Sequence, residues 1–220
     1  MLPLTFNGAS GRGARILCLG AHADDIEIGC GGTVLQLLAN HPGSACHWVV
    51  FSGTAERACE ARNSAERFLK TAGDRRVDVH EFRDGHFPVA LSEIKEVLED
   101  VKRGFAPDLI FTHFREDRHQ DHRVVSDVTW QTFRDHLILE YEVPKWDGDL
   151  GVPGCYVALP DEVRRRKIEH LLAAFPSQRR AKGWFTEETF LALMRLRGVE
   201  CGAPEGYAEA FYARKVRLAP

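Results

Sequence analysis

The sequence lacks the features that mark secreted, membrane-spanning and nucleic-acid-binding proteins. Its N-terminus has no basic segment followed by an apolar core and a small-residue cleavage site, and no run reaches the roughly 20 apolar residues of a membrane span. The 29 basic residues are matched by 32 acidic ones, and the formal net charge of -3 predicts no basic surface for nucleic acid. We therefore expect a cytoplasmic protein with a small-molecule partner, and a homo-oligomer is left open.

The six cysteines form no Cys-x-x-Cys pair. Several lie within apolar runs, such as Cys18 in the stretch 15–19. This distribution predicts buried thiols in a reducing compartment, rather than a disulfide framework or a zinc knuckle. The chain also has no internal repeat and no low-complexity tract.

Short apolar runs alternate with helical patterns through the first 140 residues, which predicts βαβ units around a mainly parallel sheet. The expected strands are 15–20, 46–52, 77–82 and 108–113, and the expected helices are 30–39, 55–71 and 92–103. In the last helix, Ser92 is the expected N-cap, with Lys95 and Lys102 on the solvated face.

The pattern changes after residue 140. The segment 141–154 is rich in Pro, Gly and Asp, which predicts a long irregular loop. Helices at 161–175 and 186–198 and a closing strand near 207–216 are expected to follow, with the basic run 164–167 on the solvated side of its helix. A chain of 220 residues with 44% hydrophobic residues is consistent with one domain, 1–220.

The first chemically distinctive stretch is L-G-A-H-A-D-D-I-E-I-G-C-G-G, residues 19–32. It places His22, Asp24 and Asp25 just past the end of the first expected strand, where open α/β sheets bind ligands. The glycines at 29, 31 and 32 are expected to open a helix whose amides can approach a ligand. A nucleotide-binding turn is disfavoured, because G-x-G-x-x-G does not begin at the strand end and two carboxylates would repel a pyrophosphate.

A second stretch, T-H-F-R-E-D-R-H-Q-D-H at 112–122, follows another expected strand. His119 and His122 share one face if a helix starts here, while Asp121 is offset and could orient an imidazole ring. Two His/Asp clusters at strand ends of one sheet predict a metal site. Spacing alone does not distinguish Asp24 from Asp25 as a ligand.

The remaining histidines carry weaker signals. We interpret those at 41, 47, 80, 136 and 170 as surface or hydrogen-bonded residues, and assign no role to His86 and His113.

The two stretches resemble the signature of the GlcNAc-phosphatidylinositol de-N-acetylase superfamily, also called the PIG-L or LmbE-like family. Its usual forms are A-H-P-D-D-E-x-x-G-C-G-G and H-x-D-H, which stand here at 21–32 and 119–122. Two positions depart from the pattern. Ala23 replaces the usual Pro, and Ile26, which is followed by Glu27, replaces a frequent Glu. Neither departure changes an expected ligand.

The resemblance implies a Rossmann-like α/β fold, with helices on both faces of a mainly parallel sheet. It implies zinc held by His22, Asp25 and His122, although Fe²⁺ or another divalent metal also suits these ligand types. It assigns Asp24 as the general base for a metal-activated water. It assigns His119 to the oxyanion, with Asp121 orienting His119.

The implied activity is zinc-dependent N-deacetylation, the hydrolysis of an N-acetyl amide on an amino sugar or glycoconjugate. Arg57 is a candidate substrate contact through the same resemblance, and Lys145 and Trp146 in the irregular loop could supply a charge and a stacking face. Two other interpretations remain. One is another metal-dependent hydrolase, of the metallo-β-lactamase or phosphodiesterase type, although Asp117 stands where H-x-H-x-D-H needs a His. The other is a non-catalytic nucleotide-binding module.

Overall fold

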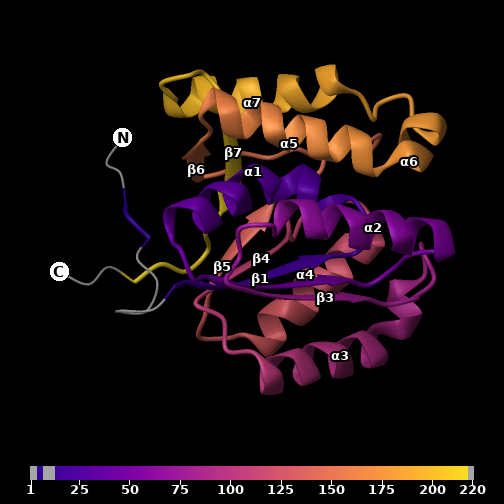
Figure 1. Cartoon of the computed structure of the whole chain (residues 1–220). Helices are drawn as coiled ribbons and strands as arrows, with labels where there is room; N and C mark the ends of the chain where they lie inside the picture. Colours follow the sequence, from indigo (N-terminus) through magenta and orange to yellow (C-terminus); the bar gives the residue numbers. More distant parts are fainter. Residues whose placement is uncertain (1–3, 7–12, 218–220) are drawn as a thin grey trace.

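The computed structural model describes residues 4–6 and 13–217 of the chain. Seven strands form one sheet in the order β3-β2-β1-β4-β5-β7-β6 (Figure 1). The strands are β1 Arg15–Gly20, β2 Ala45–Val50, β3 Asp74–Val79, β4 Leu109–His113, β5 Leu137–Tyr141, β6 Cys155–Ala158 and β7 Ala208–Tyr212. The five strands from β3 to β5 pair in parallel, whereas β7 pairs antiparallel with both β5 and β6.

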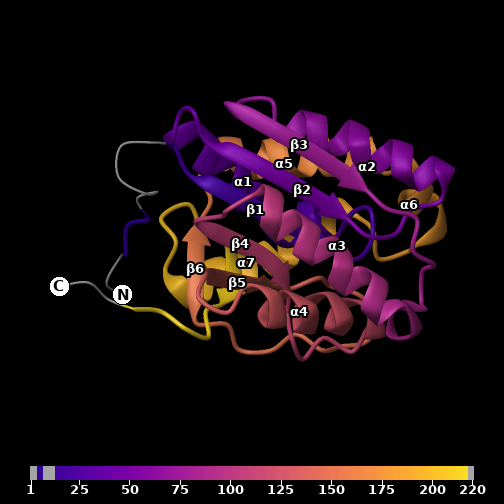
Figure 2. The same ribbon diagram turned by 90° about the horizontal axis from the view of Figure 1, so that it is seen from below.

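Helices cover both faces of this sheet (Figures 1 and 2). The helices are α1 Asp25–Asn40, α2 Ala55–Phe68, α3 Leu91–Gly104, α4 Gln120–Thr132, α5 Asp161–Ala174, α6 Pro176–Ala181 and α7 Glu187–Cys201, with a short 3-10 helix η1 at Phe87–Ala90. One hydrophobic core contains α1, α2, α5 and α7, and a second core on the opposite face contains α3 and α4. The predicted α/β class with a mainly parallel sheet is confirmed.

The burial of the central strands explains why the α/β architecture could be predicted from the sequence. Every residue of β4, and every residue of β1 except Arg15, is buried. Strands covered by helices on both faces need continuous apolar runs, and such runs stand out against helical patterns. At the edge of the sheet, the first three residues of β3 are charged and exposed, which discourages pairing with another chain.

Some predicted elements were wrong in detail. Strands β5 and β6 and helices α4 and α6 were not predicted, and β3 begins three residues earlier than expected. Helix α3 begins at Leu91 directly after η1, so Ser92 is not its N-cap. Lys102 is exposed as expected and Lys95 is partly buried, and their ammonium groups donate to the carbonyl and to the side chain of Thr132, which ties α3 to the end of α4.

The basic run 164–167 is only partly solvated. Lys167 is buried, and its ammonium donates to the carbonyl of Ile28 at 2.7 Å and to Glu209 Oε1 at 2.6 Å. Among the cysteines, three are buried as expected but Cys59 is exposed, and all six are free thiols. None of the described helices has the length and hydropathy that a membrane span requires.

The glycines of the first stretch lie inside α1, because this helix begins at Asp25 and not after them. A Cβ atom on Gly29 would lie 2.0 Å from Tyr141 Cδ2, and one on Gly31 would lie 2.6 Å from Phe68 Cε1. These positions need glycine because aromatic rings pack directly on the helix backbone. The expected role of the glycines in opening the helix for a ligand was therefore wrong.

Candidate active site

The site lies at the point where the order of the sheet reverses. The chain runs outward from β1 to β3 and then returns to place β4 on the other side of β1. Helix α1 packs on one face of the sheet and α4 on the other, so the loops that follow β1 and β4 meet at one edge. Such a switch point forms a crevice in open α/β sheets, and both sequence motifs are positioned there.

Three side chains from the two motifs converge in this crevice. Nδ1 of His22 lies 3.2 Å from Nε2 of His122 and 3.3 Å from Oδ2 of Asp25, and the last two atoms are 3.5 Å apart. Four ligands at 2.0–2.1 Å from a tetrahedral zinc ion would lie about 3.4 Å from one another. These three residues therefore have the donor types and spacing to hold a divalent ion.

His122 is held in this orientation from behind. Its Nδ1 lies 2.9 Å from Asp117 Oδ2, which leaves Nε2 facing Asp25 and His22. Lys145 donates to the same oxygen of Asp117 at 2.8 Å and to Asp149 at 2.7 Å. The ammonium of Lys145 thus lies between two carboxylates. It connects the loop after β5 to the ligand cluster, the group formed by His22, Asp25 and His122.

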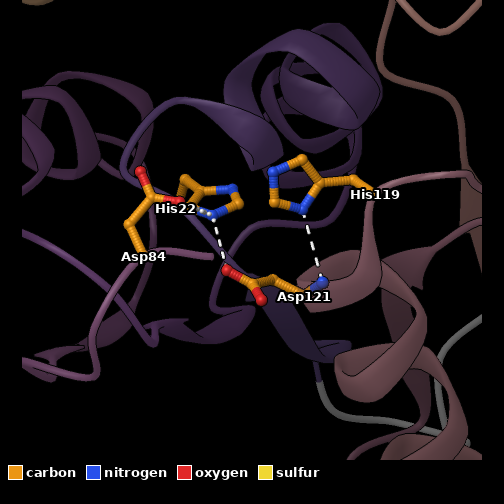
Figure 3. Close-up of side chains that lie close together, drawn as sticks. All are labelled: His22, Asp84, His119 and Asp121. Atoms are coloured by element: carbon orange, nitrogen blue, oxygen red, sulfur yellow. Dashed lines mark hydrogen bonds and ion pairs between the residues drawn. The ribbon is translucent and has the colours of Figure 1, made fainter. Parts of the chain in front are cut away.

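His22 is held on its opposite side by two further carboxylates (Figure 3). Its Nε2 lies 3.1 Å from Asp84 Oδ1 and 3.3 Å from Asp121 Oδ2. The carboxylate of Asp121 also accepts the backbone N–H groups of Gly85 at 2.6 Å and Phe87 at 3.0 Å. Asp121 contacts His119 through its own backbone N–H, which donates to Nδ1 at 3.3 Å. Its carboxylate was expected to orient His119, but its hydrogen bonds go to His22 and the loop before η1.

Asp24 lies next to the three converging side chains but belongs to another pair. It is buried, and Arg57 of α2 donates from Nη2 to its Oδ1. Arg57 was predicted as a substrate contact; it lines the cavity described below while holding Asp24. The structure therefore separates the adjacent carboxylates, since Asp25 faces the histidines and Asp24 faces the guanidinium.

His113, at the end of β4, is a site residue that the sequence left without a role. It is fully buried, its Nε2 accepts the backbone N–H of Ala21 at 2.9 Å, and its ring stacks on His122 with centroids 3.9 Å apart. It therefore fixes the loop that carries His22. His86 is exposed at the start of η1 and is outside the cluster.

The electrostatics of the cluster favour an ionised Asp25. Burial alone would raise the pKa of Asp25, but His122, His113 and His22 outweigh it and hold that pKa well below its usual value. Burial lowers the pKa of His122 to about 4, which keeps its imidazole neutral at pH 7. Burial would also lower the pKa of His22, yet the adjacent Asp25 raises it well above the usual value, so a positive charge is favoured beside Asp25.

The cluster forms the floor of a cavity of about 310 Å³. Its mouth is formed by side chains from two later segments, namely Trp146, Asp147, Gln178, Lys182 and Trp184. The volume lies at the small end of the range for ligand pockets, which run from about 300 to 1,000 Å³. Trp146, which lines this cavity, is 74% exposed.

Known proteins resemble this chain in sequence and in fold. The uncharacterized deacetylase YaiS of Escherichia coli (strain K12) is 32% identical over 142 residues, which cover 59% of this chain and 74% of that protein. The N,N'-diacetylchitobiose deacetylase of Pyrococcus horikoshii superposes with a TM-score of 0.68 at 19% identity, over 90% of this chain and 82% of its own. GalB, the 4-carboxy-2-hydroxymuconate hydratase of Pseudomonas putida KT2440, gives a TM-score of 0.72 at 18% identity, over 94% and 98%.

The structural likenesses establish a shared fold, which is found in proteins named as deacetylases and in one named as a hydratase. The family itself is defined by sequence. The PIG-L family model, described as GlcNAc-PI de-N-acetylase, matches residues 17–133, which include both His/Asp motifs. The chain belongs to the PIG-L family.

Proposed function

We propose that this protein is a metal-dependent hydrolase that removes the acetyl group from an N-acetylated amino sugar or glycoconjugate. The observation that carries the proposal is the spacing of 3.2–3.5 Å among the donor atoms of His22, Asp25 and His122 at the floor of the cavity. Family membership supports the reaction, because the family is described by de-N-acetylation.

His22, Asp25 and His122 would hold a zinc ion, with one coordination position open toward the cavity. Two imidazoles and one carboxylate also suit Fe²⁺, so ligand type alone does not select the metal. When bound, the ion supplies water activation near neutral pH and polarises the acetyl carbonyl. Asp117 and His113 contribute by keeping His122 in place.

Asp24 is the proposed general base. Its carboxylate lines the cavity next to Asp25, where it can take a proton from the attacking water. Burial raises the pKa of Asp24, although the Arg57 guanidinium opposes that shift. A raised pKa makes a carboxylate a better proton acceptor, and the ion pair with Arg57 holds it in place.

His119 is the proposed group that steadies the oxyanion of the tetrahedral intermediate. It lines the same cavity, and its ring centroid lies 4.8 Å from that of His22. Because Nδ1 accepts the backbone N–H of Asp121, the ring carries its proton on Nε2, from which it can donate to the developing negative charge. Asp24, once it has taken the proton of the water, can pass that proton to the departing amine. The backbone N–H of Asp121 fixes the ring through Nδ1.

The substrate is proposed to place its N-acetylated ring over the cluster, with a glycosidic or lipid substituent at the mouth. The deacetylase from Pyrococcus horikoshii is named for a disaccharide of N-acetylated sugars, and this agrees with a cavity that holds one ring and opens beside Trp146. The nucleotide-binding alternative loses its main support, because Gly29 and Gly31 pack against aromatic rings and Gly32 packs against Leu159 and Glu209.

The test is a comparison of two variants at adjacent positions. We expect Asp24→Asn to retain the metal and lose turnover, and Asp25→Ala to lose both. Metal content is measured by atomic absorption. Turnover is measured as acetate released from free, nucleotide-linked and lipid-linked N-acetylated sugars. Full activity of the Asp24 variant would refute its role as base, and a parent protein without a stoichiometric divalent metal would refute the proposed function.

A further inference from the structure

The segment 142–154 between β5 and β6, here called the mouth loop, carries Trp146 and Asp147 at its turn, and both line the cavity. The mouth loop has no helix or strand of its own. A segment of this kind keeps one conformation only if its ends or its side chains are tied to the rest of the fold. The contacts at its two ends therefore determine where Trp146 and Asp147 lie.

One buried side chain of α7 holds both ends of the mouth loop. Arg197 donates from Nε and Nη2 to the two carboxylate oxygens of Glu142, at 2.9 and 2.7 Å, and Glu142 directly follows β5. The same Nη2 donates to the carbonyl of Gly151, toward the other end of the loop, at 3.0 Å. Arg197 and Glu142 are only 3% and 5% exposed, so little water competes for this planar pairing.

The end at Gly151 is also fitted closely against the sheet. A Cβ atom there would lie 2.5 Å from the hydroxyl of Tyr212, so only a glycine lets the backbone approach β7 this closely. Tyr212 donates in turn to Glu142 at 3.0 Å, and its ring stacks on Phe114 with centroids 3.9 Å apart. Arg197, Glu142 and Tyr212 thus form one connected group that sets the spacing between the two ends of the loop.

The other segment at the cavity mouth is joined to the same helix. Trp184 lines the cavity and lies just before Thr186, whose side chain caps α7 by accepting the backbone N–H of Thr189 at 3.3 Å. Helix α7 lies over β6 and β7 (Figure 1). The mouth residues of both segments are therefore positioned through α7, at its start by Trp184 and near its end by Arg197.

We propose that Arg197 is a positioning residue for substrate binding, which holds the mouth loop in the conformation where Trp146 contacts the part of the substrate outside the cavity. The inference rests on the proposed function. Among the described residues, Arg197 donates to Glu142, Gly151 and Glu200, none of which lines the cavity. It therefore acts on the affinity for an extended substrate and not on the chemical step.

Hydrogen exchange measured by mass spectrometry tests the hold on the loop without relying on activity. The variant is Glu142→Gln/Arg197→Met, which removes both buried charges together and so leaves no unpaired carboxylate in the interior. We expect the amides of the mouth loop to exchange at least about tenfold faster than in the parent, and those of β1 and β4 to be unchanged. Arg195→Met is the matched control, because Arg195 is an exposed residue of the same helix that donates to Gly206. Equal exchange of the loop in the double variant and the parent overturns the proposal.

Acetate release provides the second readout, with each protein loaded with one equivalent of Zn²⁺. For the glycoconjugate that the parent hydrolyses fastest, the KM of the double variant should rise about tenfold, as expected if about one molecule in ten holds the competent loop conformation. Its kcat should stay within about twofold, because bound substrate orders the loop. The affinity for the free N-acetylated sugar, measured by its competition with the conjugate, should also stay within about twofold, because that sugar does not extend to Trp146.

The outcomes separate this inference from the proposed function. An equal loss of affinity for the conjugate and the free sugar, or a fall in kcat with KM unchanged, overturns the role of Arg197 while the proposed function stands. A parent that releases acetate from none of the N-acetylated sugars overturns the proposed function and, with it, the role of Arg197 in binding this substrate.

Discussion

Glu209 offers a quantitative test of how α1 is held under the site. It lies on β7, is buried, and accepts from the backbone N–H groups of Gly32 at 2.8 Å and Thr33 at 2.7 Å. The same carboxylate pairs with Lys167, which also donates to the carbonyl of Ile28. Two side chains from α5 and β7 thus bridge one turn of the helix that carries Asp25.

Glu209→Gln converts one acceptor oxygen into an amide N–H donor and removes the counter-charge of buried Lys167. Breaking a buried ion pair by removing one partner costs about 3–5 kcal/mol. For a protein of this size each kcal/mol corresponds to about 2–4 °C, so the melting temperature should fall by about 6–20 °C. Lys167→Met should lower the free energy of unfolding by less than Glu209→Gln does, because Glu209 keeps its hydrogen bonds from both backbone N–H groups.

The assay is urea unfolding followed by circular dichroism, with melting temperatures measured in parallel. Glu187→Gln is the matched control, because this residue is exposed in the first turn of α7 and its change should stay within about 0.5 kcal/mol of the parent. A loss below about 1 kcal/mol in Glu209→Gln would refute the reasoning, since the carboxylate would then contribute little beyond an amide.

Two further predictions concern the pH dependence of stability and the packing of α1. Burial lowers the pKa of His47, whose Nε2 lies 2.7 Å from Asp78 Oδ2, below its usual value near 6.5. The unfolded chain therefore takes up this proton at higher pH than the folded one, so the contribution of His47 is complete above pH 6.5 and is lost as pH falls through the folded pKa. As the pH is lowered from 7.5 to 5, the urea midpoint of His47→Asn should fall less steeply than that of the parent. Parallel curves for the two proteins would contradict this. Gly29→Ala should lower the free energy of unfolding by about 3 kcal/mol, because the added methyl group overpacks against Tyr141. Gly183→Ala is the control, because a Cβ atom there meets no atom within 4 Å and should leave the stability unchanged. Equal stability of the two variants in urea would show that Tyr141 moves at little cost.

The sequence predicted β1, β2, β3 and β4, of which the central ones form continuous buried apolar runs, and it also predicted the closing strand β7. Strands β5 and β6 were missed because they have only five and four residues, and the pairing of both with β7 joins segments that are far apart along the chain. Lys167 was misassigned for a similar reason. It stands in a basic run, and only the tertiary pairing with Glu209 shows that it is buried.

At the site, two motifs at strand ends predicted that His22, His122 and one of two adjacent carboxylates would converge, and the family resemblance selected Asp25. The sequence missed the residues that support them, because an orienting contact depends on side-chain direction and not on residue type. A signal existed for Asp84, which follows β3 as His22 follows β1. Asp117 stands where the H-x-H-x-D-H pattern needs a histidine, and nothing in the sequence marks it as the carboxylate that holds His122.

The ion pair between Lys145 and Asp117 makes the cavity mouth and the ligand cluster thermodynamically linked. A ligand that fixes His122 also favours the loop conformation that places Lys145 beside Asp117. By thermodynamic reciprocity, a ligand that orders that loop also stabilises the orientation of His122. With the proposed metal bound, a substrate that contacts Trp146, the next residue, would therefore strengthen the retention of that metal. Metal loading, in turn, would protect the segment 142–154 from proteolysis.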